Sequence, residues 1–364
     1  MEQLVLHEFH QTLGARFGVL DETELVEDYG DVAAEETALH ESAGVLDFSF
    51  RSRLCLVGTD RVRFLHGQVT NDIKKLRAGE GCYAALVTAK GRMESDLNIY
   101  CLTDEVLMDF EPGLATRVTE RLEKFLVADD VQVVNVAPHY GLFSVQGPRS
   151  ADVIKELGLF RELPVQPFGS IKAADGSLGE IYLAKNSRLR GDGFDLFVPT
   201  AALNEVAQKL VTAGKSVGAR PCGWRAFESS RVAAGVPRFG VDMDETNLPQ
   251  ETGIEGRAVS YTKGCYIGQE VLNRVHTMGH VNRTMMGLEL ADDLNGLPAK
   301  GDKLISEGKE VGTVTSAVRS ARLKKSLGLG YVRREARQAG ATVTVRGSSG
   351  ESTARLAELP FNIE

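Results

Sequence analysis

The sequence pattern changes near residue 283, and this change constrains the fold more than any other feature. Up to that point, helical stretches alternate with pairs of strand-like runs. Beyond it the helical signal largely vanishes, and five short β-rich runs follow, separated by glycine-rich turns: MMGLEL, DKLIS, VGTVTSAV, LGLGYV and ATVTVR. Several short strands with regular turn signals are typical of a small all-β barrel or sandwich. We therefore predict two parts, residues 1–283 and residues 284–364.

The first part, residues 1–283, is predicted to be an α+β body. Residues 81–102 and residues 179–199 each contain two β-rich runs joined by a polar turn with glycine, which is typical of a hairpin. Helical spacing of apolar residues is found over 201–214 and predicts helical structure over 1–45. Helices that alternate with antiparallel hairpins favour α+β over a Rossmann layout, and no G-x-G-x-x-G or Walker sequence occurs.

Charge and apolar patterning exclude some classes of function. The net charge of −8 argues against nucleic-acid binding, which needs clustered lysine and arginine. No run approaches the roughly 18 apolar residues of a membrane span, and no signal peptide is readable at the start. The cysteines are odd in number and widely scattered: Cys55, Cys82, Cys101, Cys222 and Cys265. This pattern indicates reduced thiols, so a cytoplasmic location is expected.

Cys265 stands in an unusual setting, YTKGCYIGQE, which raises the question of a metal site. His276 and His280 follow it at helical spacing, but the nearest other cysteine, Cys222, is 43 residues away. Structural zinc usually has four ligands in tighter pairs. The sequence therefore predicts no metal site here.

A reactive thiol is the second interpretation of Cys265. The stretch GQEVLNRVHTMG predicts a helix that ends at Gly279, and Cys265 lies just ahead of its start. The helix dipole and the nearby Lys263 both favour thiolate over thiol, whereas Glu270 in the first turn opposes it. No histidine is close enough in sequence to name as a general base. An inert buried cysteine in a turn between glycines is the third interpretation. The residues alone leave this question open.

The eight residues K-G-C-Y-I-G-Q-E resemble the hallmark of the YgfZ family of folate-binding proteins. These proteins are relatives of the glycine cleavage T-protein and are associated with iron–sulfur cluster maintenance. Residues 235–251, 64–76, 145–148 and 312–332 match further blocks of the T-protein superfamily in the right order. The resemblance implies a cloverleaf around a central channel, with a body of two interwoven antiparallel α+β subdomains followed by a C-terminal β-barrel.

The resemblance also implies tetrahydrofolate as the ligand and names residues for it. Asp195 stands where T-proteins have a glutamate that pairs with the pterin edge, and a carboxylate suits the N–H donors of that edge. Tyr83 matches a tyrosine that lies against the folate. Arg231 matches an arginine suited to the glutamate tail. The alternatives are a solvent-facing strand acid for Asp195, a buried core tyrosine for Tyr83 and a plain surface ion pair with Glu228 for Arg231.

Three residues are expected from the resemblance to carry chemistry: Asp96, Cys265 and Lys263. Asp96 keeps the second carboxylate of the T-protein catalytic segment, and Ser95 replaces the first. One carboxylate can still act as a general base or stabilise a developing positive charge. A hairpin-strand acid on the solvent face is the alternative for Asp96.

The resemblance predicts a tetrahydrofolate-binding protein that supports iron–sulfur cluster assembly or repair in client proteins. A folate-dependent aminomethyltransferase or methyltransferase is the alternative, and a non-catalytic folate scaffold is a second one. Two departures from T-proteins favour the first prediction. The KGCYIGQE block replaces a sequence without cysteine, and the tryptophan-containing GW-x-M-P stretch near the N-terminus is missing, since the only tryptophan is Trp224.

Overall fold

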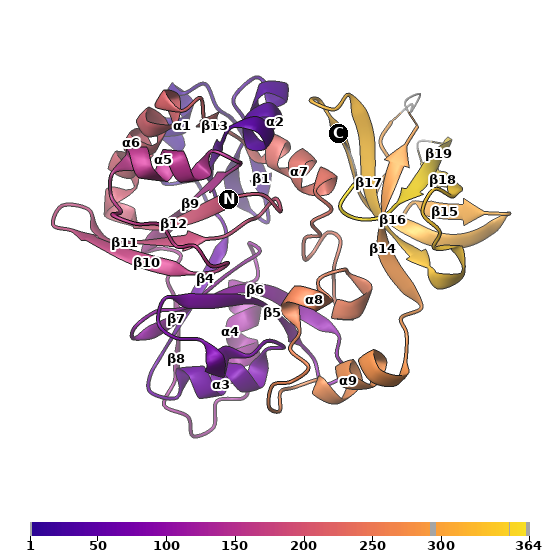
Figure 1. Cartoon of the computed structure of the whole chain (residues 1–364), viewed down its shortest axis with the longest axis horizontal. Helices are drawn as coiled ribbons and strands as arrows, with labels where there is room; N and C mark the ends of the chain where they lie inside the picture. The colour runs from indigo at the N-terminus through magenta and orange to yellow at the C-terminus, as the bar shows by residue number, and fades with distance from the viewer. Residues whose placement is uncertain (1, 292–295, 349, 362–364) are drawn as a thin grey trace.

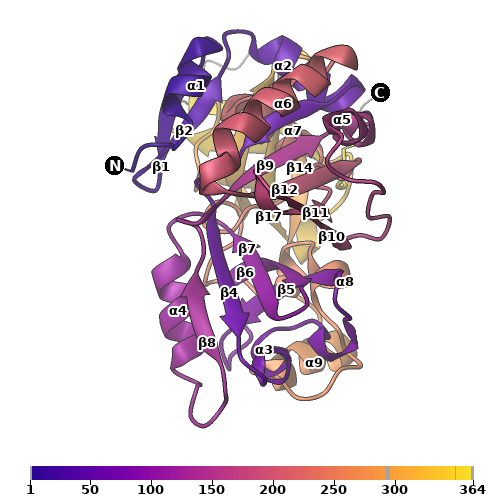
Figure 2. The same cartoon turned by 90° about the vertical axis from the view of Figure 1, so that its left-hand side faces the viewer.

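The structure, a computed structural model, describes residues 2–291, 296–348 and 350–361. It has three lobes (Figure 1): one built on a six-stranded sheet, one on a five-stranded sheet, and a closed barrel. Seen from the side, the six-stranded lobe lies above the five-stranded lobe, and the barrel lies behind both (Figure 2). The predicted α+β class with a C-terminal barrel is confirmed.

The first lobe is a sheet with strand order β10-β11-β12-β9-β3-β13, in which only β13 pairs in parallel. Its strands are β3 (Gly44–Asp47), β9 (Tyr140–Gln146), β10 (Ser170–Asp175), β11 (Gly179–Lys185), β12 (Gly193–Pro199) and β13 (Arg220–Pro221). Helices α5 (Ser150–Leu157) and α6 (Leu203–Ser216) cover one face. Their buried residues recur at helical spacing, as in Leu203, Val206 and Leu210 of α6, so each helix places an apolar stripe on the sheet.

The N-terminal segment departs from the helical prediction for residues 1–45. Helices α1 (His7–Thr12) and α2 (Val32–Glu41) are present, but a hairpin of β1 (Arg16–Leu20) and β2 (Thr23–Asp28) separates them. The hairpin turns at Asp21 and Glu22, both of which have positive φ. Such a two-residue turn normally carries asparagine or glycine, so its signal is weak in this sequence.

The second lobe is a fully antiparallel sheet with strand order β5-β6-β7-β4-β8. Its strands are β4 (Ser52–Val57), β5 (Glu80–Val87), β6 (Met93–Cys101), β7 (Glu105–Phe110) and β8 (Gln132–Asn135). Helices α3 (Arg61–Gln68) and α4 (Ala115–Glu123) pack on one face. The other face packs against the chain that holds α8 (Glu255–Ala258) and α9 (Gln269–Met278). Both hairpins predicted from sequence, β5–β6 and β11–β12, are confirmed.

The two body lobes are interwoven because the chain passes between them repeatedly. Strands β3 and β4 are separated by a short link, residues 48–51, yet they belong to different sheets. The chain returns to the first sheet at β9 and leaves it again after α7 (Trp224–Ala233). Neither lobe is therefore a continuous segment.

The barrel closes in the order β14-β17-β16-β15-β18-β19, with β14 also paired to β19. Its strands are β14 (Arg283–Leu290), β15 (Lys303–Ser306), β16 (Lys309–Ser320), β17 (Lys325–Arg333), β18 (Thr342–Gly347) and β19 (Gly350–Ala357). The five runs found in the sequence are β14 to β18. The alternation in the polar stretch GESTARLA is weaker, so β19 was not predicted.

Candidate functional site

The centre of the candidate site is a tyrosine–carboxylate pair on neighbouring strands. In the β5–β6 register, Tyr83 lies opposite Asn98 and Ala85 lies opposite Asp96, which places Tyr83 and Asp96 on a diagonal of one sheet face. The Tyr83 hydroxyl donates a hydrogen bond of 2.7 Å to Oδ2 of Asp96. Two residues assigned to the ligand from the resemblance are thus in direct contact.

The second oxygen of Asp96 is unpaired. Oδ1 is buried and has no hydrogen-bond partner among the residues that the structure describes. Burial and the nearby charge of Glu111 raise the pKa of Asp96, while the hydrogen bond from Tyr83 opposes the rise. A buried carboxylate oxygen without a partner is costly unless a ligand or water satisfies it. Asp96 is therefore no solvent-facing strand acid.

Arg257 forms one side of this site. Its guanidinium lies 4.5 Å from the centroid of the Tyr83 ring, a cation–π contact. Arg190 lies near Arg257. Burial lowers the pKa of the Arg190 guanidinium, and the positive charge of Arg257 lowers it further. Neither arginine forms an ion pair within the described part of the chain. Arg190 donates to the Gly235 carbonyl oxygen at 3.1 Å. Two guanidinium groups whose charges no carboxylate of the described residues neutralises favour an anionic ligand.

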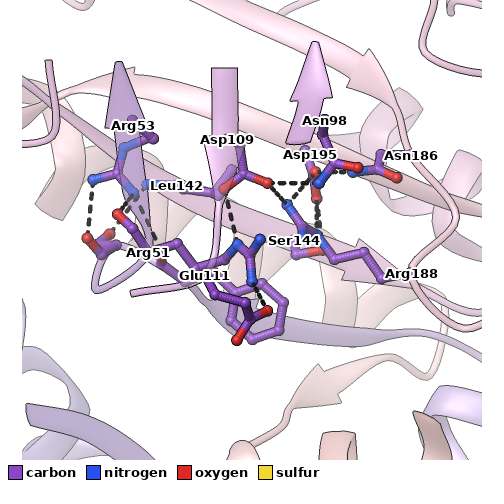
Figure 3. Close-up of polar contacts among 12 residues, drawn as sticks. Arg51, Arg53, Asn98, Asp109, Glu111, Leu142, Ser144, Asn186, Arg188 and Asp195 are labelled. Atoms are coloured by element: carbon purple, nitrogen blue, oxygen red, sulfur yellow. Dashed lines mark hydrogen bonds and ion pairs between the residues drawn. The ribbon is translucent and has the colours of Figure 1, made fainter. Parts of the chain in front are cut away.

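A separate network of buried ion pairs lies close enough to Asp96 for the charge of Glu111 to raise the pKa of Asp96, and Figure 3 shows part of this network. Arg51 donates to Asp109 at 2.8 Å and to Glu111 at 2.7 Å, and Arg238 donates to Glu111 at 2.8 Å. Burial alone would raise the pKa of Glu111, but the guanidinium groups of Arg238 and Arg51 lower it to about 2. Burial also acts to raise the pKa of Asp109, but the guanidinium groups of Arg188 and Arg51 bring it far below its usual value.

Asp195 lies at the end of this network and is completely buried. Its Oδ1 accepts from the Ser144 hydroxyl at 2.7 Å and from Arg188 at 3.1 Å, and its Oδ2 accepts from Asn186 at 2.8 Å and from Arg188 at 2.7 Å. Both oxygens are occupied (Figure 3). The pterin contact expected at Asp195 stays a prediction, and it would require Arg188 or Asn186 to turn away.

Arg231 joins helix α7 to the barrel. It forms an ion pair with Asp242 and bonds of 2.8 Å to Glu228 and 2.9 Å to the Ser316 hydroxyl of β16. The side chain is almost completely buried, and the two carboxylates raise its pKa against the effect of burial. The alternative for this residue was a plain surface ion pair with Glu228. The pair with Glu228 is present, but Arg231 is buried and also pairs with Asp242, so it is no surface pair. A folate contact at Arg231 stays a prediction.

Lys263 is held by backbone carbonyls. Its Nζ donates to the carbonyl oxygens of His66 and Val69 at 2.6 Å each and of Asn71 at 2.8 Å, around the end of α3. Burial lowers its pKa to about 8, and three carbonyl dipoles favour the ammonium form, so the group is charged at neutral pH. All three hydrogens of the ammonium are thus used by the backbone.

Cys265 is the exposed cysteine of the five; Cys82 is partly buried and Cys55, Cys101 and Cys222 are buried. Burial raises the pKa of Cys82 to about 12 and that of Cys101 to about 11. The interpretation of Cys265 as an inert buried residue is therefore wrong about burial, because the side chain is exposed. The helix expected behind it is α9, which ends where predicted, before Gly279.

Sequence reasoning missed Arg188 and Arg257. The first lies in the polar turn of the β11–β12 hairpin, and a charged residue in a turn is usually solvated. Arg257 comes from a segment far from Tyr83 in sequence. Only the packing of the lobes brings them together.

A cavity of about 510 Å³ lies between α2, α7 and the barrel, and Arg190 and Arg322 line it. Among the described residues, no group of three or more His, Cys, Asp or Glu side chains is arranged to hold a metal ion. Within the same residues, no helix is long and apolar enough to cross a membrane.

The comparisons with known proteins agree with this architecture. Two interwoven α+β lobes followed by a closed barrel define the T-protein class. The sequence matches the GCVT N-terminal domain over residues 6–263 and the glycine cleavage T-protein C-terminal barrel domain over residues 283–362. The chain belongs to the glycine cleavage T-protein family. The narrower YgfZ assignment stays a prediction.

Similar proteins span almost the whole chain. An aminomethyltransferase from Bacillus pumilus is 27% identical over 363 residues, covering 99% of this chain and 98% of the relative. An aminomethyltransferase from Bacillus subtilis is 28% identical, covering 93% of this chain and 92% of the relative. The crystal structure of glycine cleavage system aminomethyltransferase T from Bartonella henselae superposes with a TM-score of 0.87 at 22% identity, covering 99% of this chain and 97% of that chain. This last likeness concerns the fold alone.

Proposed function

We propose that this chain is a tetrahydrofolate-dependent transferase that moves an aminomethyl or methyl group, as in the aminomethyltransferases to which it is similar. One observation carries the proposal: Oδ1 of Asp96 is buried beside Tyr83 and has no hydrogen-bond partner in the part of the chain that the structure describes. A carboxylate oxygen in this state suits an N–H donor of a bound ligand.

The residues present fit a folate. Asp96 would hold the ring through its free oxygen, and Tyr83 would lie against the ring while its hydroxyl fixes the carboxylate. Arg257 and Arg190 would attract the carboxylates of the glutamate tail. Asp195 is the weaker candidate for the ring edge, because Arg188 already neutralises it.

Tetrahydrofolate supplies nitrogen atoms that accept a one-carbon unit. Asp96 would act as the general base, or its negative charge would stabilise a positive charge on the transferred group. Its raised pKa makes it a stronger base than an ordinary aspartate, and Tyr83 keeps it in one orientation. The rate should therefore fall as the pH drops through that raised pKa.

The test is Asp96→Asn, with Glu94→Gln as the matched control. Glu94 is on the same strand but pairs with Arg121, away from the site. We expect Asp96→Asn to weaken tetrahydrofolate binding about tenfold in calorimetry and to lower folate-dependent ammonia release from an aminomethyl donor by about 10²–10⁴. Glu94→Gln should change neither. A wild-type chain that binds no tetrahydrofolate would refute the proposal. Equal rates for Asp96→Asn and wild type would remove Asp96 from it.

A second candidate function is support of iron–sulfur cluster assembly or repair in client proteins, with Cys265 as the working thiol. The observation that favours it is the exposure of Cys265, since exposure is what a thiol relay needs. Cells that carry Cys265→Ser should lose cluster-enzyme activity, whereas Asp96→Asn should spare it. The reverse result would favour one-carbon transfer, and full activity with both variants would leave a folate scaffold.

A further inference from the structure

The cavity of about 510 Å³ between α2, α7 and the barrel is a different place from the Tyr83–Asp96 pair. The described residues that line it include none of Tyr83, Asp96 and Arg257. Its walls come from α2, the β11–β12 turn, α7, the β16–β17 turn and residues 360–361. Figure 1 shows α7 between the six-stranded lobe and the barrel. A cavity of this volume can hold a small organic ligand.

Apolar side chains form part of the wall of this cavity. Leu39 of α2 and Phe361 are buried, and Leu189 and Leu323 are partly buried. Such side chains can cover the apolar body of a ligand, and removing apolar surface from water favours binding. The cavity therefore suits a ligand that is at least partly apolar.

Ser229 supplies a polar group to the cavity. The residue is only 4% exposed, and its Oγ has no hydrogen-bond partner among the described residues. Ser229 lies on α7 one turn before Ala233, and both line the cavity, so they share the face of α7 that borders it. Buried hydroxyls are usually hydrogen-bonded, and a hydroxyl can donate as well as accept. The Ser229 hydroxyl is therefore available to a bound ligand.

The β16–β17 turn brings positive charge to the cavity. Arg322 of this turn lines the cavity together with His40 of α2. Burial lowers the pKa of His40, and the charge of Arg322 lowers it further, so the guanidinium lies near the imidazole. Arg319, Lys324 and Lys325 lie on or beside the same turn. None of these four cations forms an ion pair with the residues that the structure describes.

The two carboxylates that line the cavity are already engaged. Glu36 accepts from the Ser320 hydroxyl at 2.7 Å and from two backbone N–H groups of the β16–β17 turn. Asp192 pairs with Lys185 at 3.0 Å. Because neither carboxylate pairs with the Arg322 guanidinium, its N–H donors are left for an anion from outside the chain.

We propose that this cavity is a second ligand site, which binds a small organic anion with a carboxylate or phosphate group on an apolar body. Arg322 pairs with the anionic group, Ser229 donates a hydrogen bond to the ligand, and the apolar walls cover its body. Arg190 also lines the cavity and lies near Arg257, so this end of the cavity is the nearer one to the folate site. The second site goes beyond the proposed folate chemistry, and its failure would leave the proposed transferase standing.

The test is fluorescence titration of the full chain with two probes: 8-anilinonaphthalene-1-sulfonate, an apolar anion, and N-phenyl-1-naphthylamine, a neutral counterpart. We expect saturable binding of the anion to wild type, and Arg322→Gln should weaken it about tenfold, because charge-assisted hydrogen bonds to the anionic group are lost. Binding of the neutral probe should not change in Arg322→Gln. The matched control is Arg319→Gln, which removes a nearby positive charge that does not line the cavity, and it should change the affinity less than about twofold. Equal affinities of the anion for Arg322→Gln and Arg319→Gln would overturn the proposal.

Competition experiments with the wild-type chain identify the anionic group and separate the two sites. Displacement of the anionic probe by 3-phenylpropionate would assign a carboxylate, and displacement by phenyl phosphate would assign a phosphate. Displacement by neither would refute the proposal. The binding that depends on Arg322 should persist with saturating tetrahydrofolate. If tetrahydrofolate removes it, the cavity belongs to the folate site and is no second site.

Discussion

At the residue scale, Arg188 determines the state of Asp195. In a T-protein-like site a carboxylate at this position is expected to be open to the pterin edge. Here Arg188 donates to Asp195 at 2.7 Å and also to Asp109 at 2.7 Å, so one guanidinium joins two carboxylates from different sheets. All three side chains are nearly or fully buried. The pair is thus part of the interior that joins the two body lobes.

This gives a stability prediction for Asp195→Asn. The change leaves Arg188 with Asp109 as its one remaining carboxylate, and breaking a buried ion pair typically costs about 3–5 kcal/mol in the free energy of unfolding. Urea unfolding would measure the loss. Asp192→Asn is the control, because the Lys185–Asp192 pair on the same hairpin is more exposed and should cost less than about 1 kcal/mol. Equal losses would show that the Asp195 pair is no more important than a surface one.

At the element scale, the KGCYIGQE segment depends on its two glycines differently. Gly268, the residue just before α9, has a φ of +87°, and a Cβ there would lie 2.6 Å from the Thr88 carbonyl oxygen. Both the dihedral angle and the close approach require glycine. At Gly264 a Cβ would meet the His66 ring at an ordinary 3.5 Å.

The prediction is that Gly268→Ala destabilises the chain and Gly264→Ala does not. For Gly268→Ala we expect a loss of about 1–3 kcal/mol, because a left-handed alanine is strained and Thr88 must move. For Gly264→Ala we expect a change within about 0.5 kcal/mol. Thermal unfolding of both variants would measure this. A Gly268→Ala variant as stable as wild type would mean that the start of α9 can shift freely.

At the scale of the whole molecule, the buried ion pairs connect the body lobes and predict sensitivity to acid. The pKa of Glu111 is about 2 in the folded protein against an ordinary value of 4.5. A depressed carboxylate pKa adds stability that is fully present above about pH 4.5. That stability is lost as the pH falls towards the folded-state value. The raised pKa of Asp96 has the opposite effect on stability in acid, whereas the lowered pKa of Asp109 adds to the effect of Glu111.

We therefore expect the free energy of unfolding to fall steeply below about pH 4.5, by on the order of 3 kcal/mol from Glu111 alone. Urea unfolding between pH 7 and pH 2 would give the profile. Glu111→Gln removes the titrating group, so its profile should be flatter than that of wild type, although the variant is less stable at pH 7. Parallel profiles would show that Glu111 does not control the acid response.

The barrel is expected to close the site. Asp242 of the body accepts from the hydroxyls of Thr315 and Ser316 on β16, both at 2.6 Å, and Glu36 of α2 accepts from the Ser320 hydroxyl at 2.7 Å. We predict that a chain without residues 284–364 keeps a folded but weakened body and loses folate binding. Circular dichroism and calorimetry would test both parts. Normal folate binding by the truncated chain would contradict the closing role. Full-length Glu36→Gln, which weakens one contact, should still bind.

The sequence patterns alone determined the α+β class, two hairpins and the C-terminal run of strands, because periodicity and turn chemistry are local; the two interwoven lobes were implied by the resemblance. The β5–β6 and β11–β12 hairpins, helix α9 and the run of short strands after residue 283 were all predicted from such patterns. The sequence patterns did not predict the β1–β2 hairpin, because its Asp-Glu turn lacks the residues usual for such a turn. They also did not predict β19, because its alternation of polar and apolar residues is weak. The resemblance selected Tyr83 and Asp96, which the fold places in contact.

Tertiary structure alone decided what each side chain can do. One buried oxygen of Asp96 has no partner among the described residues, whereas both oxygens of Asp195 accept hydrogen bonds from Arg188, Ser144 or Asn186. A sequence pattern does not distinguish these two aspartates. They differ in which hydrogen-bond donors from distant segments reach their oxygens. The same holds for Lys263, because its ammonium group reaches the carbonyl oxygens of His66 and Val69 only after α3 and the KGCYIGQE segment pack together. Charges and hydrogen-bond partners depend on contacts between distant segments, and a sequence pattern does not contain them.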